Sequence, residues 1–312
     1  MGGTLTIAKK EFVDHVSDRT FLLCFAVLLA AMVGGGYQSS TSAQALIFND
    51  AAKGITYQQG ETWKAITYLL TVFVIEPFVL IGILSAIALG FSTVYKERTE
   101  GSLKVLLSYP VSRNSVILGK LIGGVTALLF AVLASMAVTF GIVLYYLSIP
   151  ATGDFIIRIA LIAVAGMSPL LFYFFIGMSI STIIHDSLTA LVGTVLIFAA
   201  LHRDILTIII TLARGIFTAL RIDIYLPYMN YESSYRPSWD AFNMRSVSLM
   251  SPMETFLRFS YSVFEFEGKA TPLTVRWDTL LPKNLDLIGA LTIYALAGLI
   301  VCFIVFKRSD VE

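Results

Sequence analysis

Residues 20–37 read TFLLCFAVLLAAMVGGGY and contain no charged side chain. A helix crosses the hydrocarbon core of a bilayer with about 20 apolar residues, so this run and its flanks are long enough to span a membrane. The whole chain agrees, because 57% of its 312 residues are hydrophobic and only 14% are charged. Soluble domains carry roughly 25% charged residues. The sequence therefore predicts an all-α integral membrane protein and excludes a nucleic-acid-binding domain.

Further apolar runs predict about six transmembrane helices in a single transmembrane domain, residues 1–312. After 20–37, the expected spans are 66–95, about 118–147, 154–184, a run that starts near Ser187, and 286–306. Ser168-Pro169 is expected to break and kink the fourth span, since proline lacks the N–H that a helix needs.

The fifth span is ambiguous. LTALVGTVLIFAAL is followed by His202-Arg203-Asp204, and a second apolar piece, ILTIIITLARGIFTAL, then resumes. Either the charged triplet lies within one long span, or the helix ends there and a re-entrant or interfacial piece follows. Six crossings are expected, with five or seven left open.

Basic residues indicate the orientation, because short cytoplasmic loops carry an excess of Lys and Arg. They gather before the first span, between the second and third, and after the last: Lys9, Lys10, Arg19; Lys96, Arg98, Lys104, Arg113, Lys120; Lys307, Arg308. Residues 148–153 have none. We therefore expect a multi-pass protein of the cell membrane with both termini cytoplasmic, a cytoplasmic interfacial helix over 1–19 and an extracytoplasmic segment over 221–285.

The cytoplasmic stretch 95–120 reads YKERTEGSLKVLLSYPVSRNSVILGK. Thr99-Glu100-Gly101-Ser102 offers capping residues and an acidic first turn, and Pro110 would end a helix. Leu103, Leu106 and Leu107 fall at helical spacing between them. Such a helix of about two turns is too short to be stable alone, so it needs a surface to pack on. An ordinary amphipathic interfacial loop is the alternative.

This stretch, taken as residues 96–117, resembles the coupling segment of permease subunits of ATP-binding-cassette type-2 transporters. The resemblance rests on a Glu, a Gly-Ser-Leu, a Leu pair, a Pro-Val-Ser-Arg and a Gly-Lys. It implies that a short cytoplasmic helix contacts a separate ATPase subunit through Glu97, Glu100, Gly101, Ser102, Leu103, Leu106, Leu107, Pro110 and Arg113. It also implies a second copy of the permease, ATP and Mg²⁺ bound by the partner ATPase, and no cofactor in this chain.

Two other segments resemble the same family. Lys9-Lys10-Glu11-Phe12 is similar to its N-terminal amphipathic helix. Ser251-Pro252-Met253-Glu254 is similar to a segment before the last span in the subgroup that contains the permease of the nitrous-oxide-reductase maturation transporter. That subgroup has an aspartate in its fifth span, for which Asp204 is the nearest candidate. Gly90 to Thr93 depart from the subgroup, which has an aromatic-Asp pair there.

Charged residues within the apolar runs are candidates for a polar path, because intramembrane charges usually face the bundle interior or water. They are Glu76, Arg158, Arg203 and Asp204. Pairing between helices, which would only fix the bundle, is the alternative reading. The tyrosines and Trp239 of the segment 221–285 predict an interfacial cap, with a gate or a docking surface for an extracytoplasmic protein as the sharper alternative.

No G-x-x-x-x-G-K-S/T loop, H-E-x-x-H, Cys-x-x-Cys or G-x-S-x-G motif occurs, so the sequence predicts no enzyme. An intramembrane hydrolase built on His185, His202 or Asp204 is the weakest hypothesis. Cys24 and Cys302 both lie in apolar runs, which is typical of packing residues. The expected function is ATPase-driven export across the membrane. A membrane scaffold that transmits ATPase motion to an extracytoplasmic partner, or a secondary transporter, are the alternatives. Nothing in the sequence indicates the substrate.

Overall fold

The computed structural model describes residues 2–52, 66, 68–99, 113–147, 153–184, 186–202, 205, 249–264, 282 and 284–308. Across these ranges the secondary structure is helical, with no strand. The helices are α1 (Gly2–Ser17), α2 (Arg19–Ala52), the π-helical turn η1 (Thr71–Ile75), α4 (Glu76–Thr99), α6 (Arg113–Leu147), α7 (Gly153–Ile183), α8 (Ser187–Ala200), α11 (Pro252–Phe264) and α13 (Leu285–Arg308). The predicted all-α fold is confirmed.

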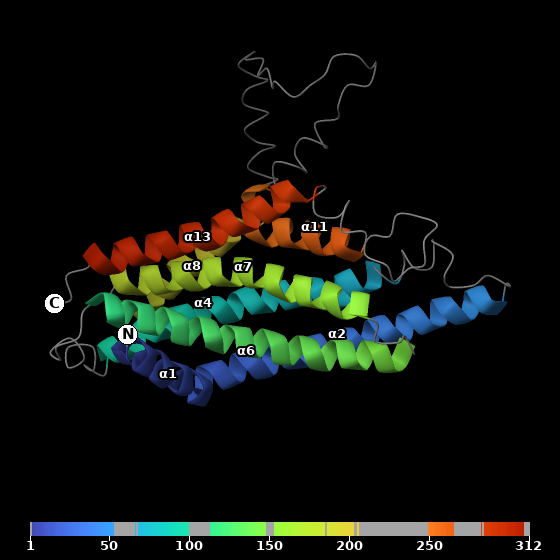
Figure 1. Cartoon of the computed structure of the whole chain (residues 1–312), viewed down its shortest axis with the longest axis horizontal. Helices are drawn as coiled ribbons and strands as arrows, with labels where there is room; N and C mark the ends of the chain where they lie inside the picture. Colours follow the sequence, from blue (N-terminus) through green and yellow to red (C-terminus); the bar gives the residue numbers. More distant parts are fainter. Residues whose placement is uncertain are drawn as a thin grey trace, which may run out of the picture.

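The long helices lie side by side along one axis, and the start of α1 and the end of α13 lie at the same end of the bundle (Figure 1). We call this end the terminal end. Five helical stretches of the described chain are long and apolar enough to cross a membrane: Arg19–Asn49, Tyr68–Tyr95, Ser115–Leu147, Phe155–Ile183 and Leu285–Arg308. Their outer faces carry exposed apolar side chains such as Leu23 and Ile293, which is the pattern of a surface in contact with lipid rather than water.

The first span is longer than its apolar run. α2 continues from residue 37 through the polar stretch that follows and ends at Ala52. Ser39 and Ser40 donate hydrogen bonds to the Gly36 carbonyl at 3.1 and 2.6 Å, and Thr41 donates to the Tyr37 carbonyl at 3.1 Å. Because these hydroxyls bond to carbonyls of their own helix, the polar residues do not end it.

The proline of the fourth span does not end its helix. α7 runs from Gly153 to Ile183 with Pro169 inside it, so the expected break is wrong. Ser168 Oγ donates to the Leu291 carbonyl of α13, and the proline itself is buried. Proline is tolerated in membrane helices where neighbouring helices support the backbone around it.

The ambiguous fifth span ends before its charged triplet. α8 stops at Ala200, where the N–H groups of Leu201 and His202 bond to the carbonyls of Ile197 and Ala199. Its 14 residues span about 21 Å at 1.5 Å each, less than the roughly 30 Å of a bilayer core. The helix therefore ends before the triplet. Arg203 and Asp204 lie outside the described residues, and the re-entrant or interfacial piece after them stays a prediction.

A π-helical turn precedes Pro77 in the second span. The Glu76 N–H bonds to the Thr71 carbonyl, five residues back. Pro77 has no N–H, so the Phe73 carbonyl lacks its usual helical donor. That carbonyl lies against Gly35 of α2, where a Cβ atom would come within 1.7 Å of its oxygen. The glycine therefore allows the two helices to meet backbone to backbone.

Candidate functional site

The segment expected to contact a partner lies between the last turn of α4 and the first turn of α6. Glu97 belongs to the end of α4, and Arg113 is the first residue of α6. The other residues proposed for this contact lie outside the described residues: Glu100, Gly101, Ser102, Leu103, Leu106, Leu107 and Pro110. The roles of all nine therefore stay predictions. The structure does describe the contacts that hold the two flanking helices, α4 and α6, in place.

Helix α1 packs one face against the neighbouring helices, mainly α6. Ala8, Glu11 and His15 are buried, and they recur at the spacing of three and four residues that places side chains on one side of a helix. Lys9 and Lys10 are exposed on the other side. The sequence correctly predicted a helix before the first span. It did not show that two polar residues would face inward.

Two glycines of α6 bring α1 close. A Cβ atom at Gly119 would come within 2.5 Å of the Ile7 side chain, and one at Gly123 within 2.4 Å of the Glu11 Cβ and 3.0 Å of the Ala8 carbonyl. Glycines four residues apart form a flat strip on a helix, and in membranes such strips let two backbones pack closely. Larger residues at either position would push α1 away.

The close approach forms a buried ion pair. Lys120 Nζ lies 3.0 Å from Glu11 Oε1, and the two side chains are only 1% and 7% exposed. Removal of one partner from such a pair leaves an uncompensated charge inside the protein, which is strongly destabilising. Glu11 belongs to the N-terminal motif and Lys120 to the Gly-Lys that ends the predicted coupling motif. The tertiary structure thus joins two motifs 109 positions apart.

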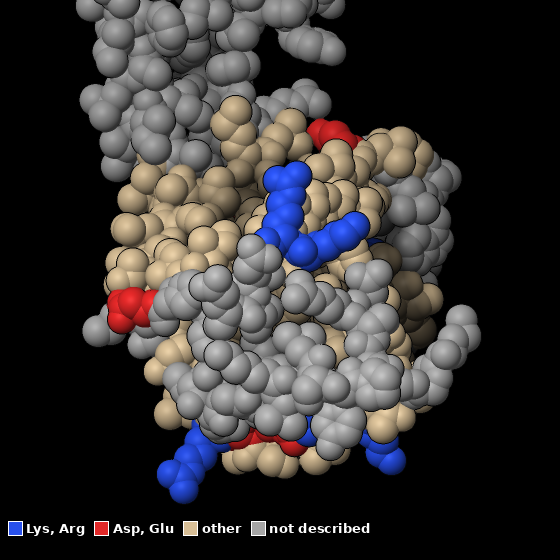
Figure 2. Space-filling model, turned by 90° about the vertical axis from the view of Figure 1, so that its left-hand side faces the viewer, with Lys and Arg blue, Asp and Glu red and all other residues tan. Residues whose placement is uncertain are grey.

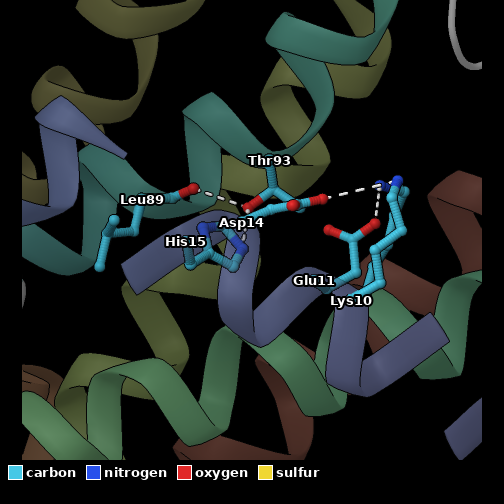
Figure 3. A network of polar contacts seen from close by, with 7 residues as sticks. Lys10, Glu11, Asp14, His15, Leu89 and Thr93 are labelled. Carbon is cyan, nitrogen blue, oxygen red and sulfur yellow. Dashed lines mark hydrogen bonds and ion pairs between the residues drawn. The ribbon is translucent and has the colours of Figure 1, made fainter. Parts of the chain in front are cut away.

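Helix α1 also contacts α4. His15 Nε2 lies 3.4 Å from Thr93 Oγ1, and that hydroxyl donates to the Leu89 carbonyl at 2.7 Å. Because its own hydrogen bonds to the Leu89 carbonyl, the Thr93 oxygen can accept a hydrogen bond from the His15 tautomer that carries a hydrogen on Nε2. Figure 3 shows Glu11 and His15 side by side on α1, with His15 directed at Thr93. Helix α1 therefore contacts both α4 and α6, the helices on either side of the undescribed segment.

Basic side chains mark the terminal end. Figure 2 looks onto it and shows described Lys and Arg residues at its centre and its lower edge. Lys307 and Arg308 form the last turn of α13, where positive charge also complements the helix dipole. These positions match the basic clusters that predict a cytoplasmic face, although the side of the membrane stays a prediction.

The turn between α7 and α8 also has a defined structure. Asp186 is the N-cap of α8, and its carboxylate accepts hydrogen bonds from the Thr189 hydroxyl and the Thr189 backbone N–H. These two bonds lower the pKa of Asp186, so the carboxylate is charged at neutral pH. The neighbouring His185 lies outside the described residues.

The candidate intramembrane charges do not form one cluster in the described residues. Arg158 of α7 is 4% exposed, and its guanidinium donates to the Val263 carbonyl in the last turn of α11. Glu76 is exposed at the start of α4. This contact joins α7 to α11, while pairing of the candidate charges between helices stays a prediction. A transport path through Glu76, Arg158, Arg203 and Asp204 stays a prediction.

Helix α11 is more deeply buried than the interfacial cap that the sequence predicted for its segment. It lies within the segment 221–285, yet Phe256 and Val263 are fully buried and the helix packs on α7, α13 and η1. Phe256 meets Phe78 of α4 edge to face, with ring centroids 5.9 Å apart. The available signal was Ser251-Pro252, a good helix start, followed by apolar residues at helical spacing. Over the described ranges, no three His, Cys, Asp or Glu side chains gather to hold a metal ion.

Comparison with known proteins gives one family. The family model described as ABC-2 family transporter protein matches residues 5–311, from α1 to the end of α13. The match includes α1, the ion-paired start of α6 and the undescribed segment between α4 and α6. No curated protein matches the chain.

Proposed function

This chain belongs to the ABC-2 family of transporter proteins, and on that premise we propose that it is the permease subunit of an ABC exporter driven by separate ATPase subunits. It is a multi-pass membrane component of a transporter. We infer further that two copies assemble in the cell membrane, that both termini are cytoplasmic, and that ATP and Mg²⁺ bind to the partner subunits. The likeness to nitrous-oxide-reductase maturation permeases remains a prediction about the subgroup.

The observation that supports this function is the arrangement of the terminal end. A short segment with the coupling motif connects α4 and α6, and both helices continue through the bundle as apolar spans. A push on that segment would therefore be applied directly to two membrane-crossing helices. ATPase closure would tilt these helices and open or close a path for the substrate. The carried molecule is not indicated by the sequence or the fold.

The experiment tests whether the predicted helix between α4 and α6 binds an ATPase. The chain carrying Leu103→Asp and Leu106→Asp is purified together with its Walker-motif ATPase, since two charges on the apolar face of the helix should abolish packing. We expect co-purification of the ATPase to fall at least tenfold. Ser108→Asp is the matched control, because Ser108 falls on the opposite side of the same predicted helix.

Unchanged co-purification of the double variant would contradict the coupling assignment. Transport by the purified chain without any ATPase would instead support a secondary transporter. ATPase binding with no movement of a solute would support a scaffold that acts on an extracytoplasmic protein.

A further inference from the structure

Helix α1 contacts both helices that flank the predicted coupling segment, α4 before it and α6 after it. Each contact lies near the end of the helix that adjoins the segment. Its contact on α4 is Thr93, about two turns before the helix ends at Thr99. Its contact on α6 is Lys120, about two turns after the helix begins at Arg113. The contacts come from Glu11 and His15, which lie one turn apart on α1. One helix, α1, therefore connects the end of α4 to the start of α6.

We propose that α1 is a clasp that fixes the separation of the ends of α4 and α6, with Glu11, Lys120, His15 and Thr93 as its positioning residues. The inference rests on the proposed function, because the clasp gains its purpose from a partner that pushes on the segment between these ends. With the clasp closed, a displacement of that segment moves α4 and α6 together. When the clasp is open, the end of α4 and the start of α6 separate, and a displacement of the segment no longer moves the two helices together.

Three observations set this contact apart from ordinary helix packing. Both charged groups of the Glu11–Lys120 pair are buried, so their attraction is little weakened by water or salt. The Gly119 and Gly123 strip leaves no room for α1 to shift towards α6. A comparable pair on the exposed side of α1, Lys10 with Asp14 at 3.5 Å, has side chains that are 58% and 57% exposed. Of these two ion pairs, Glu11–Lys120 is the one that joins α1 to another helix.

The test measures the separation of the two ends directly. In the full-length chain without its native cysteines (Cys24→Ser, Cys302→Ala), nitroxide labels are attached at Thr99→Cys and Asn114→Cys. Labelled chain is diluted with unlabelled chain so that only distances within one molecule are recorded by pulsed electron resonance. We expect a narrow distance distribution that becomes at least twofold wider with Glu11→Gln. The charge swap of Glu11→Lys with Lys120→Glu should restore the narrow distribution.

Asp14→Asn is the matched control, because it removes the exposed pair on the same helix and should leave the distribution unchanged. Thr93→Val, which keeps the size of the side chain but loses its contact with His15, provides a second route if the Glu11 variant does not fold. It should widen the distribution as well. An unchanged width in a folded Glu11→Gln or Thr93→Val variant would overturn the clasp, as would a swap that fails to restore it.

A second measurement separates this proposal from the proposed function. With the partner ATPase added, Glu11→Gln should still bind it but should lose the permease-dependent stimulation of ATP hydrolysis about tenfold. If the Glu11→Gln variant binds the ATPase and still stimulates ATP hydrolysis fully, the clasp is overturned. A wild-type chain that binds no ATPase would refute the proposed function, and the label distances would still decide on the clasp.

Discussion

At the scale of single residues, three glycines lie at close contacts between helices. Gly35, Gly119 and Gly123 each lie where a backbone or side chain of another helix occupies the space of a Cβ atom. In membranes, helix association gains little from hydrophobic burial against lipid, so close van der Waals contact of backbones carries more of it. These glycines therefore set which helices become neighbours.

Gly35→Ala should lower the thermal stability of the detergent-purified protein. Its Cβ would lie 1.7 Å from the Phe73 carbonyl oxygen, so α2 or η1 must shift. Overpacking of this kind costs about 1–3 kcal/mol. Gly34→Ala is the control, since no atom outside its own helix turn lies within 4 Å of the added Cβ, and alanine favours a helix. Equal melting temperatures for the two variants would contradict the backbone contact.

At the scale of elements, the least expected feature is α11. Its apolar residues belong to a segment whose composition resembles an interfacial cap, yet they pack inside the bundle. Arg158 holds its last turn through the Val263 carbonyl, and Asn284 donates to Ser262 at 2.8 Å, so α7 and the start of α13 both anchor it. Because Arg158 and Asn284 are both buried, their contacts explain why a helix of 13 residues is stable here.

Phe256→Ala should destabilise the folded bundle by about 3–5 kcal/mol, the usual cost of a large aromatic cavity. Phe256 is fully buried between Phe78 and Gly166. Thermal unfolding or protease resistance in detergent measures the loss. Tyr261→Ala, on the same helix but 43% exposed, should cost much less. A larger effect at Tyr261 than at Phe256 would contradict the burial of α11 in the bundle.

At the scale of the whole molecule, the bundle brings the starts of α1 and α6 and the ends of α4 and α13 to one end (Figure 1). The same end carries the basic clusters, which predicts that it faces the cytoplasm. Because the end of α4 and the start of α6 lie there, a force applied at this end acts on both helices. The clasp made by α1 would join the two.

The orientation predicts a labelling pattern. In the chain without native cysteines, Pro150→Cys should react with a membrane-impermeant thiol reagent in intact cells, because residues 148–152 connect the far ends of α6 and α7. Ser108→Cys and Glu312→Cys should react only in inverted vesicles. Reaction of Ser108→Cys in intact cells would place the predicted coupling segment outside the cell.

The sequence predicted the helices better than their ends. Runs such as 286–306 match α13 closely, because apolar length and the need for internal hydrogen bonds leave a membrane segment few alternatives to a helix. The C-terminal end of α2 and the expected break of α7 at Pro169 were predicted wrongly. Both depend on hydrogen bonds and on contacts with neighbouring helices, which an apolar run of sequence does not show.

By itself, the sequence determined that this is an all-helical membrane protein with a polar motif between its second and third spans. Hydropathy and helical period are local properties, so each run carries them without reference to the rest of the chain. Only the tertiary structure paired Glu11 with Lys120, turned His15 towards Thr93 and buried α11. These partners are far apart in the sequence, and their meeting depends on which faces of all the helices fit together.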